Sequence, residues 1–302
     1  GHHPASEDGR VIEACARCRG DLTGGSLDSW PGQPSHPGGV AVAVAIDRRV
    51  WCRVETGGDG IEIESKDTLQ KLRARTAGEL VHAEGAGLAA RVLQALGLES
   101  GARVVTQTRV AGASRLGSRS ALTVALTAAV AGAVDRSLTA EQMASLCRDL
   151  ELRPGPPPAA VRGYHTAMRG GVLTFELGAG GARVMPALVD PARVEESLLL
   201  VDAGAGSAST AADEGRRESD GDAAVRQALQ EMAAVSRQAW EALGAGRYED
   251  LVTLMTQEWE AEKRLAAGGT TAAIDGVVET VRAAGGAARA GEGATAIWAP
   301  PG

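Results

Sequence analysis

The chain has 302 residues, 44% hydrophobic and 23% charged, so it can form one large or two ordinary globular domains and is too apolar for wholesale disorder. Its net charge of −7 argues against a general nucleic-acid binder, because phosphate neutralisation requires a clustered basic excess. No run of about 18 apolar residues predicts a membrane span, and the first residues lack the apolar core of a signal peptide, so we expect a cytoplasmic protein.

The N-terminal part is predicted to alternate strands with turns. Val11–Cys18 reads as a strand, followed by a glycine-rich turn at Gly20–Gly25 and a Pro/Gly loop at Pro31–Gly39. Val40–Val54 and Gly60–Glu64 alternate apolar and polar residues at period two, which predicts two further strands.

A helical period follows over Thr76–Leu96, although Glu84 interrupts its apolar face. The remaining elements predicted before residue 186 are a strand at Ala102–Val110, helices at Ser120–Val134 and Ala140–Leu150, and a strand at Gly171–Leu177.

The second half is predicted to be mostly helical. A strand at Leu198–Val201 precedes a polar loop at Gly204–Gly221, and a final strand is expected at Thr295–Ala299. Three helices are predicted between them, at Ala223–Leu243, Arg247–Ala267 and Thr271–Ala284. Strands followed by helices, without regular βαβ repetition, indicate an α+β fold.

Three glycine-rich turns are candidate ligand sites. The turn at 111–121 lies between a strand and a helix, where backbone amides and the helix dipole favour an anion, and Ser118 and Ser120 add hydroxyls for phosphate or magnesium. A capped strand-to-helix turn explains the same pattern. The turns at 178–181 and 204–207 lack a full GxGxxG opening a helix, which argues for ordinary loops and against a dinucleotide oxidoreductase.

Two acids flank the Gly-Gly turn in 19–28. Asp21 and Asp28 carry carboxylates that could accept hydrogen bonds from a polyol, or could cap the turn. Cys15 and Cys18 form a CxxC, but no second ligand pair follows at zinc spacing, so we expect two packed or edge thiols.

The order of these segments resembles the GHMP kinase superfamily over residues 10–299, and most closely its bacterial sugar-kinase branch of heptose and fucose kinases. Residues 17–31 are similar to that branch's opening ARIDLAGGTLDIWP, and 114–121 (SRLGSRSA) to its phosphate loop GLGSSSA. The other similar segments are 40–48, 259–265 with Ile274-Asp275 (W..KR.L…ID in the family), and 290–296 at the position of the family's last glycine motif.

The resemblance implies an α+β, two-lobed GHMP kinase fold, with an N-terminal ribosomal S5-like lobe over 10–185 and a C-terminal ferredoxin-like lobe over 186–302. It implies transfer of the ATP γ-phosphoryl, with Mg²⁺, to a hydroxyl of a small polyol or sugar-like acceptor, by a monomer or homodimer. Neither nucleic acid nor membrane is an expected partner.

The resemblance also assigns residues. Arg19 matches the motif arginine near the transferred phosphoryl, Asp28 with Asp21 would hold the acceptor, and Ser118 with Glu151 would be the magnesium ligands. The nucleotide loop is implied to be Ser114, Arg115, Leu116, Gly117, Ser118, Arg119 and Ser120.

Three departures from the family pattern put activity in doubt. Gly163 stands where the family has its catalytic aspartate, with His165 two positions on as a candidate substitute base. Arg115 and Arg119 replace a glycine and a serine of the phosphate loop, and the last glycine motif is eroded to residues 291–295. Two interpretations follow from these departures. The first is a weak kinase, because phosphoryl transfer depends mostly on positioning and charge neutralisation, and homoserine kinases of the same superfamily are similar in lacking such a base. The second is an inactive pseudokinase that binds a ligand or a protein.

Overall fold

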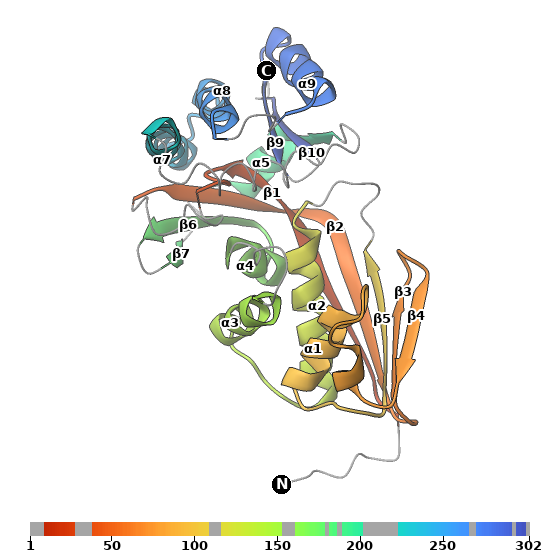
Figure 1. Cartoon of the computed structure of the whole chain (residues 1–302). Helices are drawn as coiled ribbons and strands as arrows, with labels where there is room; N and C mark the ends of the chain where they lie inside the picture. The colour runs from red at the N-terminus through yellow and green to blue at the C-terminus, as the bar shows by residue number, and fades with distance from the viewer. Residues whose placement is uncertain are drawn as a thin grey trace.

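The computed structural model describes residues 9–27, 38–108, 116–152, 161–178, 181–185, 189–201, 223–265, 270–291 and 294–299 (Figure 1). Within them the chain forms a two-lobed α+β fold built on two sheets. The seven-stranded sheet contains β1 (Val11–Thr23), β2 (Val40–Thr56), β3 (Ile61–Ser65), β4 (Gln70–Ala74), β5 (Ala102–Thr108), β6 (Val172–Gly178) and β7 (Gly181–Met185). The three-stranded sheet contains β8 (Leu198–Val201), β9 (Ala287–Gly291) and β10 (Ala294–Trp298) in the order β8-β10-β9.

The long strand β2 organises the larger sheet. Antiparallel β1 pairs along one of its edges, while β6 pairs with Val40–Val44 and β5 with Val50–Thr56 on the other. β3 then adds parallel to β5, and β4 closes the sheet as an antiparallel edge strand. This pairing places the end of β1 beside the C-terminal lobe, as Figure 1 shows.

Four helices cover one face of this sheet: α1 (Gly87–Ala95), α2 (Ser118–Ala133), α3 (Ala140–Glu151) and α4 (Val161–Arg169) (Figure 1). α2 is apolar around most of its circumference and is buried between β1, β2 and the other helices. Its alanines, including Ala121, Ala125 and Ala129, allow the strands to approach closely because they add little side-chain volume.

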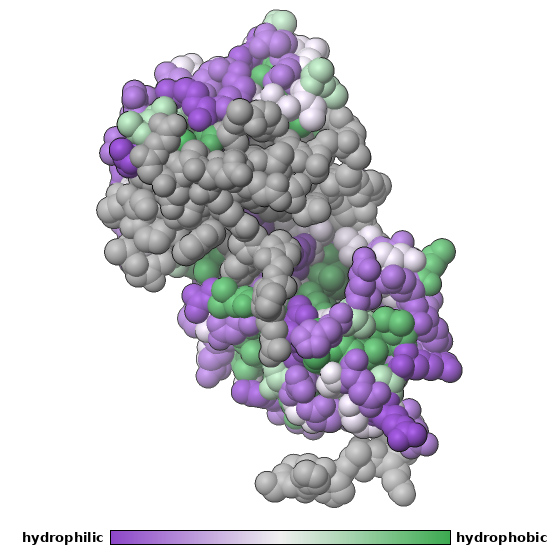
Figure 2. Space-filling view, viewed as in Figure 1, coloured by the Kyte–Doolittle hydropathy of each residue, from purple (hydrophilic) through white to green (hydrophobic). Residues whose placement is uncertain are grey.

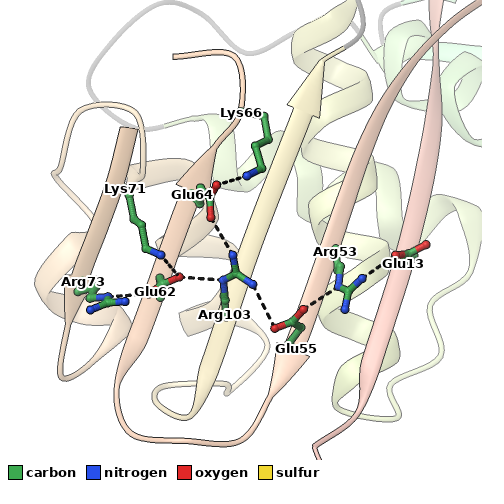
Figure 3. A network of polar contacts seen from close by, with 9 residues as sticks. All are labelled: Glu13, Arg53, Glu55, Glu62, Glu64, Lys66, Lys71, Arg73 and Arg103. Atoms are coloured by element: carbon green, nitrogen blue, oxygen red, sulfur yellow. Dashed lines mark hydrogen bonds and ion pairs between the residues drawn. The ribbon is translucent and has the colours of Figure 1, made fainter. Parts of the chain in front are cut away.

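The opposite face of the sheet carries a ladder of cross-strand ion pairs (Figure 3). Arg103 on β5 is central to it, with Nε 2.8 Å from Glu62 Oε1 and Nη2 2.9 Å from Glu64 Oε2. Further pairs extend the ladder to both sides, through Glu55, Arg53 and Glu13 toward β1 and through Lys66, Lys71 and Arg73 toward β4. Opposite charges that face each other across strands stabilise this part of the sheet. Charged residues on β4 also prevent this edge strand from pairing with strands of other chains.

The C-terminal lobe contains α5 (Pro191–Ser197), α7 (Ala223–Gly244), α8 (Asp250–Lys263) and α9 (Ala272–Ala283). Helices α8 and α9 pack against β9 of the smaller sheet, and α7 packs against α8 and against β1 and β2 of the larger sheet. Trp298 is fully buried, and its indole N–H donates to the Tyr248 carbonyl at 3.1 Å. Hydrophilic residues dominate the outer surface of the α7–α9 region in Figure 2, as expected for helices with one apolar face. In the part of the chain that the structure describes, no helix combines the length and apolarity needed to cross a membrane.

The α+β class and most predicted elements are confirmed, but two boundaries were wrong. The predicted turn at Gly20–Gly25 is a continuation of β1 to Thr23, because β2 extends far enough to pair with it. The predicted helix over Thr76–Leu96 is a 3-10 turn at Ala77–Leu80 followed by α1, and Gly85 between them has φ 77°, which an α-helix cannot include. Helices α4 and α5 and strands β4, β7 and β9 were not predicted, and the predicted loop at Gly204–Gly221 lies outside the described residues.

Candidate functional site

Arg19 and Asp21 on β1 meet Arg162 on α4 in a buried charge cluster. Residues two apart on a strand share a face, so both β1 side chains point toward the helices. Arg162 binds Asp21 with two hydrogen bonds, Nε to Oδ1 at 3.0 Å and Nη2 to Oδ2 at 3.2 Å, and Arg19 Nε adds a third to Oδ1 at 3.2 Å. The side chains of Arg19 and Arg162 are 6% and 3% exposed.

These two arginines control the ionisation of Asp21. Burial alone would raise the pKa of its carboxyl, but Arg162 and Arg19 outweigh burial and hold the pKa well below its usual range. Asp21 is therefore ionised, and its carboxylate binds the guanidinium groups of Arg19 and Arg162. Asp21, which was predicted to bind the acceptor, thus lies at the site, but its carboxylate points toward Arg19 and holds that side chain in place.

The N-terminus of α2 lies directly against Arg19. The Arg19 backbone N–H donates to the Leu116 carbonyl at 2.9 Å. Leu116 and Gly117 have φ 32° and 65°, a left-handed turn that glycine adopts freely and that costs a leucine about 1–2 kcal/mol. A Cβ on Gly117 would lie 2.7 Å from Arg19 Nη1, so the absence of a side chain there admits the guanidinium.

This helix end has the properties of an anion site. The first four N–H groups of an α-helix have no intrahelical acceptor, and the helix dipole adds partial positive charge there. The first turn of α2 contains no acidic residue, and Gly117 offers no side-chain cap. Ser120, 1% exposed, has a hydroxyl without a hydrogen-bond partner among the described residues. Amides, a buried hydroxyl and Arg19 thus converge on one position.

Gly163 on α4 closes this position from the other side. A Cβ at Gly163 would lie 2.3 Å from Ser120 Oγ and 2.7 Å from Arg19 Nη1. The space in which the resemblance places a catalytic aspartate is therefore filled by Ser120 and Arg19. His165 lies about 200° further around α4, since each helical residue turns the chain about 100°.

His165 faces the sheet instead of Arg19. It is 6% exposed, and its ring centroid lies 6.3 Å from that of Phe175 on β6. Burial lowers the pKa of its imidazole, with a further contribution from nearby Arg169. The geometry does not support His165 as a substitute base.

Glu151, expected to bind magnesium, is already neutralised by residues of α2. It ends α3 with a side chain 1% exposed, and its Oε1 accepts from Thr123 Oγ1 at 2.5 Å while Oε2 lies 3.0 Å from Arg119 Nε. Burial raises the pKa of Tyr164, and the carboxylate of Glu151 beside it raises that pKa further, as expected for a phenol next to an anion.

Mg²⁺ does not fit this arrangement. The ion requires near-octahedral oxygen ligands at about 2.0–2.1 Å and usually keeps several waters. Both Glu151 oxygens have protein partners, and the carboxylate is buried, so a hydrated ion would have to displace Arg119 or Thr123 to reach it. Ser118, the other expected ligand, begins α2 half-buried. Among the described residues, no group of three or more His, Cys, Asp or Glu side chains could hold a metal.

A second buried cluster, not anticipated from the sequence, joins the end of β1 to the C-terminal lobe. Glu258 on α8, fully buried, accepts from the Gly24 N–H at 2.7 Å and from the Thr23 hydroxyl. Arg289 on β9 donates to Glu258 Oε1 and Glu262 Oε2, each at 2.9 Å. Glu262 also accepts from the Ser26 hydroxyl, so the Gly-Gly turn is fixed to α8 at two points. Arg289 also contributes to the low pKa of Asp21, which links the two clusters.

Several predicted residues cannot be placed. Asp28, Ser114 and Arg115 lie outside the described residues, as does the centre of the last glycine motif. The cysteines of the CxxC are free thiols, Cys15 exposed and Cys18 buried.

Comparison with known proteins identifies the fold. No protein-family model and no curated protein matches the sequence. Among solved structures, a D-glycero-D-manno-heptose 1-phosphate kinase from Bacteriodes thetaiotaomicron matches with TM-score 0.76 at 18% identity, covering 97% of this chain and 89% of that one. The Methanococcus jannaschii mevalonate kinase matches with TM-score 0.73 at 18% identity, covering 99% of this chain and 92% of that one. Lactococcus lactis galactokinase complexed with galactose matches with TM-score 0.76 at 14% identity, covering 96% of this chain and 86% of that one. The chain has the GHMP kinase fold, as its motifs predicted.

Proposed function

We propose that this chain binds a nucleotide polyphosphate, with ATP the expected ligand, at the N-terminus of α2, and that it transfers a phosphoryl group slowly or not at all. The observation that carries the proposal is the placement of the Arg19 guanidinium against Gly117 at the start of α2, where the glycine provides no side-chain cap, and beside Gly163. Helix amides and a preorganised guanidinium are the groups that bind and neutralise phosphates.

The same placement argues against fast transfer. In this site the base position is a glycine, and Asp21 is held by two arginines, so no described carboxylate is available to accept the acceptor's proton. Loss of a general base typically costs about 10²–10⁴-fold in rate. Arg19 would still stabilise charge on a bound phosphoryl group, because it is buried and fixed before the ligand arrives.

A slow sugar kinase is the second candidate, and one observation favours it. Phosphoryl transfer has a loose transition state that depends mainly on positioning and charge stabilisation, and the anchored Arg19 supplies both at the end of α2. The solved kinases of this fold act on heptose phosphate, mevalonate and galactose, which defines the acceptors to test.

Calorimetric titration with ATP, ADP and adenosine, followed by an ADP-release assay, tests the proposal. We expect the two phosphorylated ligands to bind at micromolar to sub-millimolar levels and adenosine at least about tenfold more weakly, because the site recognises phosphate. With galactose, heptose 1-phosphate and mevalonate as acceptors, we expect turnover below about 0.1 s⁻¹. Equal binding of adenosine and ATP would refute the phosphate site. Measurable but slow turnover with one of these acceptors would favour the slow sugar kinase, and turnover above about 1 s⁻¹ would refute slow transfer.

A further inference from the structure

Arg119 occupies the position at which a divalent cation would meet Glu151. It is the second residue of α2, in the first turn of the helix whose start forms the proposed phosphate site. Its Nε lies 3.0 Å from Glu151 Oε2, and its side chain is 39% exposed while that of Glu151 is 1% exposed. One end of the pair is therefore deep in the protein and the other reaches the site surface.

We infer that the Arg119 guanidinium replaces the metal ion, so that this chain binds the polyphosphate in its metal-free form. The inference rests on the proposed function and specifies the ionic form of its ligand. A guanidinium has five N–H donors in a rigid fork, so it can pair with a carboxylate and meet phosphate oxygens at the same time. It can thus link the Glu151 carboxylate to a phosphate without a metal ion.

The charges at the site also favour the metal-free ligand. Arg19 and Arg119 lie at the same end of α2, where the dipole adds further positive charge. Metal-free ATP carries two more negative charges than its magnesium complex. A bound Mg²⁺ would occupy phosphate oxygens and place a dication beside Arg119, and the repulsion between a dication and a unit positive charge about 4 Å apart in water corresponds to about thirtyfold in affinity.

Displacement of Arg119 by the metal would not solve this problem. The Thr123 hydroxyl holds the second oxygen of Glu151 from within α2, and the carboxylate is buried. A cation that replaced Arg119 there would have to lose most of its water shell, which Mg²⁺ does reluctantly.

Titration of the full chain with ATP in EDTA and in excess Mg²⁺ tests the inference. We expect affinity in EDTA to equal or exceed that in Mg²⁺, by up to about thirtyfold. Tighter binding in Mg²⁺ would overturn the inference while leaving the phosphate site intact. Failure to bind ATP in both buffers would instead refute the proposed function, so the two failures are distinguishable.

Arg119→Ser is the variant that isolates the effect. We expect it to lose at least about tenfold in ATP affinity in EDTA, as for a lost charge-assisted contact of about 1.4 kcal/mol. Arg148→Ser, at an exposed arginine of α3 that lies 3.7 Å from Asp149 Oδ1, is the matched control and should bind as the wild type does. Wild-type affinity of Arg119→Ser in EDTA would overturn the inference.

A double variant separates ligand binding from folding. Arg119→Ser removes a cation that is paired with the buried Glu151 carboxylate, so it carries a risk of instability. Arg119→Ser/Glu151→Gln removes both charges and keeps a side chain that can accept from Thr123. We expect this double variant to melt as a cooperative fold and to bind ATP at least about tenfold more weakly than the wild type in EDTA. Unchanged affinity of the folded double variant would contradict the role assigned to Arg119.

Discussion

Substitution of Gly163 by alanine tests whether the space beside Arg19 is filled. The new methyl group would lie 2.3 Å from Ser120 Oγ, 2.7 Å from Arg19 Nη1 and 3.0 Å from Ser120 Cβ. The hydroxyl and the guanidinium can rotate away only partly, since both side chains are buried and Arg19 is bonded to Asp21. Overpacking of this kind costs about 1–3 kcal/mol, against a helix-propensity gain of up to about 1 kcal/mol for replacing glycine in α4.

The net loss of about 1–2 kcal/mol should lower Tm by about 2–4 °C for a chain of this size. Gly276→Ala is the matched control, because Gly276 lies in α9, is exposed, and would place its methyl group with no atom within 4 Å. Thermal unfolding should show a lower Tm for Gly163→Ala and an unchanged or higher Tm for Gly276→Ala. Equal, positive shifts for both variants would show that the space at Gly163 is open and that a carboxylate would fit there.

Three further predictions concern the buried polar groups. Asp21→Asn should lower the free energy of unfolding by about 2–4 kcal/mol at pH 7, because it removes the anion that is bound to two buried guanidinium groups. Because the native pKa is lowered, this difference should begin to shrink as pH falls below about 4, where the unfolded carboxyl takes up its proton, and should go on shrinking until the native carboxyl is protonated at a much lower pH. A constant difference in urea unfolding from pH 7 to 3 would contradict this. The lowered pKa of His165 means that the unfolded chain binds its proton more readily, so wild-type stability should fall as pH drops below about 6.5. His165→Gln should reduce this loss in urea unfolding, and an unchanged pH dependence in this variant would contradict the prediction. Glu258→Gln should lower the free energy of unfolding by about 2–4 kcal/mol, because it removes the carboxylate that binds Arg289 and the Gly24 N–H. Hydrogen exchange of the Gly24 amide should become faster, and unchanged exchange there would show that this contact does not hold the turn.

The elements that the sequence predicts well are those with strong local patterns. The period-two alternation of Val40–Val54 predicted β2 almost to its ends, and the apolar run after Gly117 predicted α2. Helix α4 has weak helical propensity, with Gly163 and two β-branched residues in nine positions, and tertiary packing against α2 and β1 decides its conformation. The end of β1, up to Thr23, is likewise a strand only because it pairs with the distant strand β2.

The site shows the same division between local and distant information. Arg19 and Gly163 were identified by resemblance, but the partner of Asp21 is Arg162, which is 141 residues away and has no local pattern to reveal it. Glu258 and Glu262 could have been found, because they continue an apolar stripe of α8 at helical spacing, and buried acids on such a stripe need a cation. Glu151 was predicted to be a magnesium ligand, but in the fold it forms an ion pair with Arg119, and the sequence alone does not reveal this pairing.

Calorimetric titration with ATP of the wild type, Arg19→Met and Arg17→Met tests the phosphate site most directly. Arg17 lies on the same strand with a side chain 44% exposed, so its variant controls for the loss of one positive charge from β1. The account predicts binding at micromolar to sub-millimolar levels for the wild type and Arg17→Met, and a loss of at least about tenfold for Arg19→Met. Absence of heat for the wild type up to several millimolar ATP, or equal affinity of Arg19→Met, would contradict it.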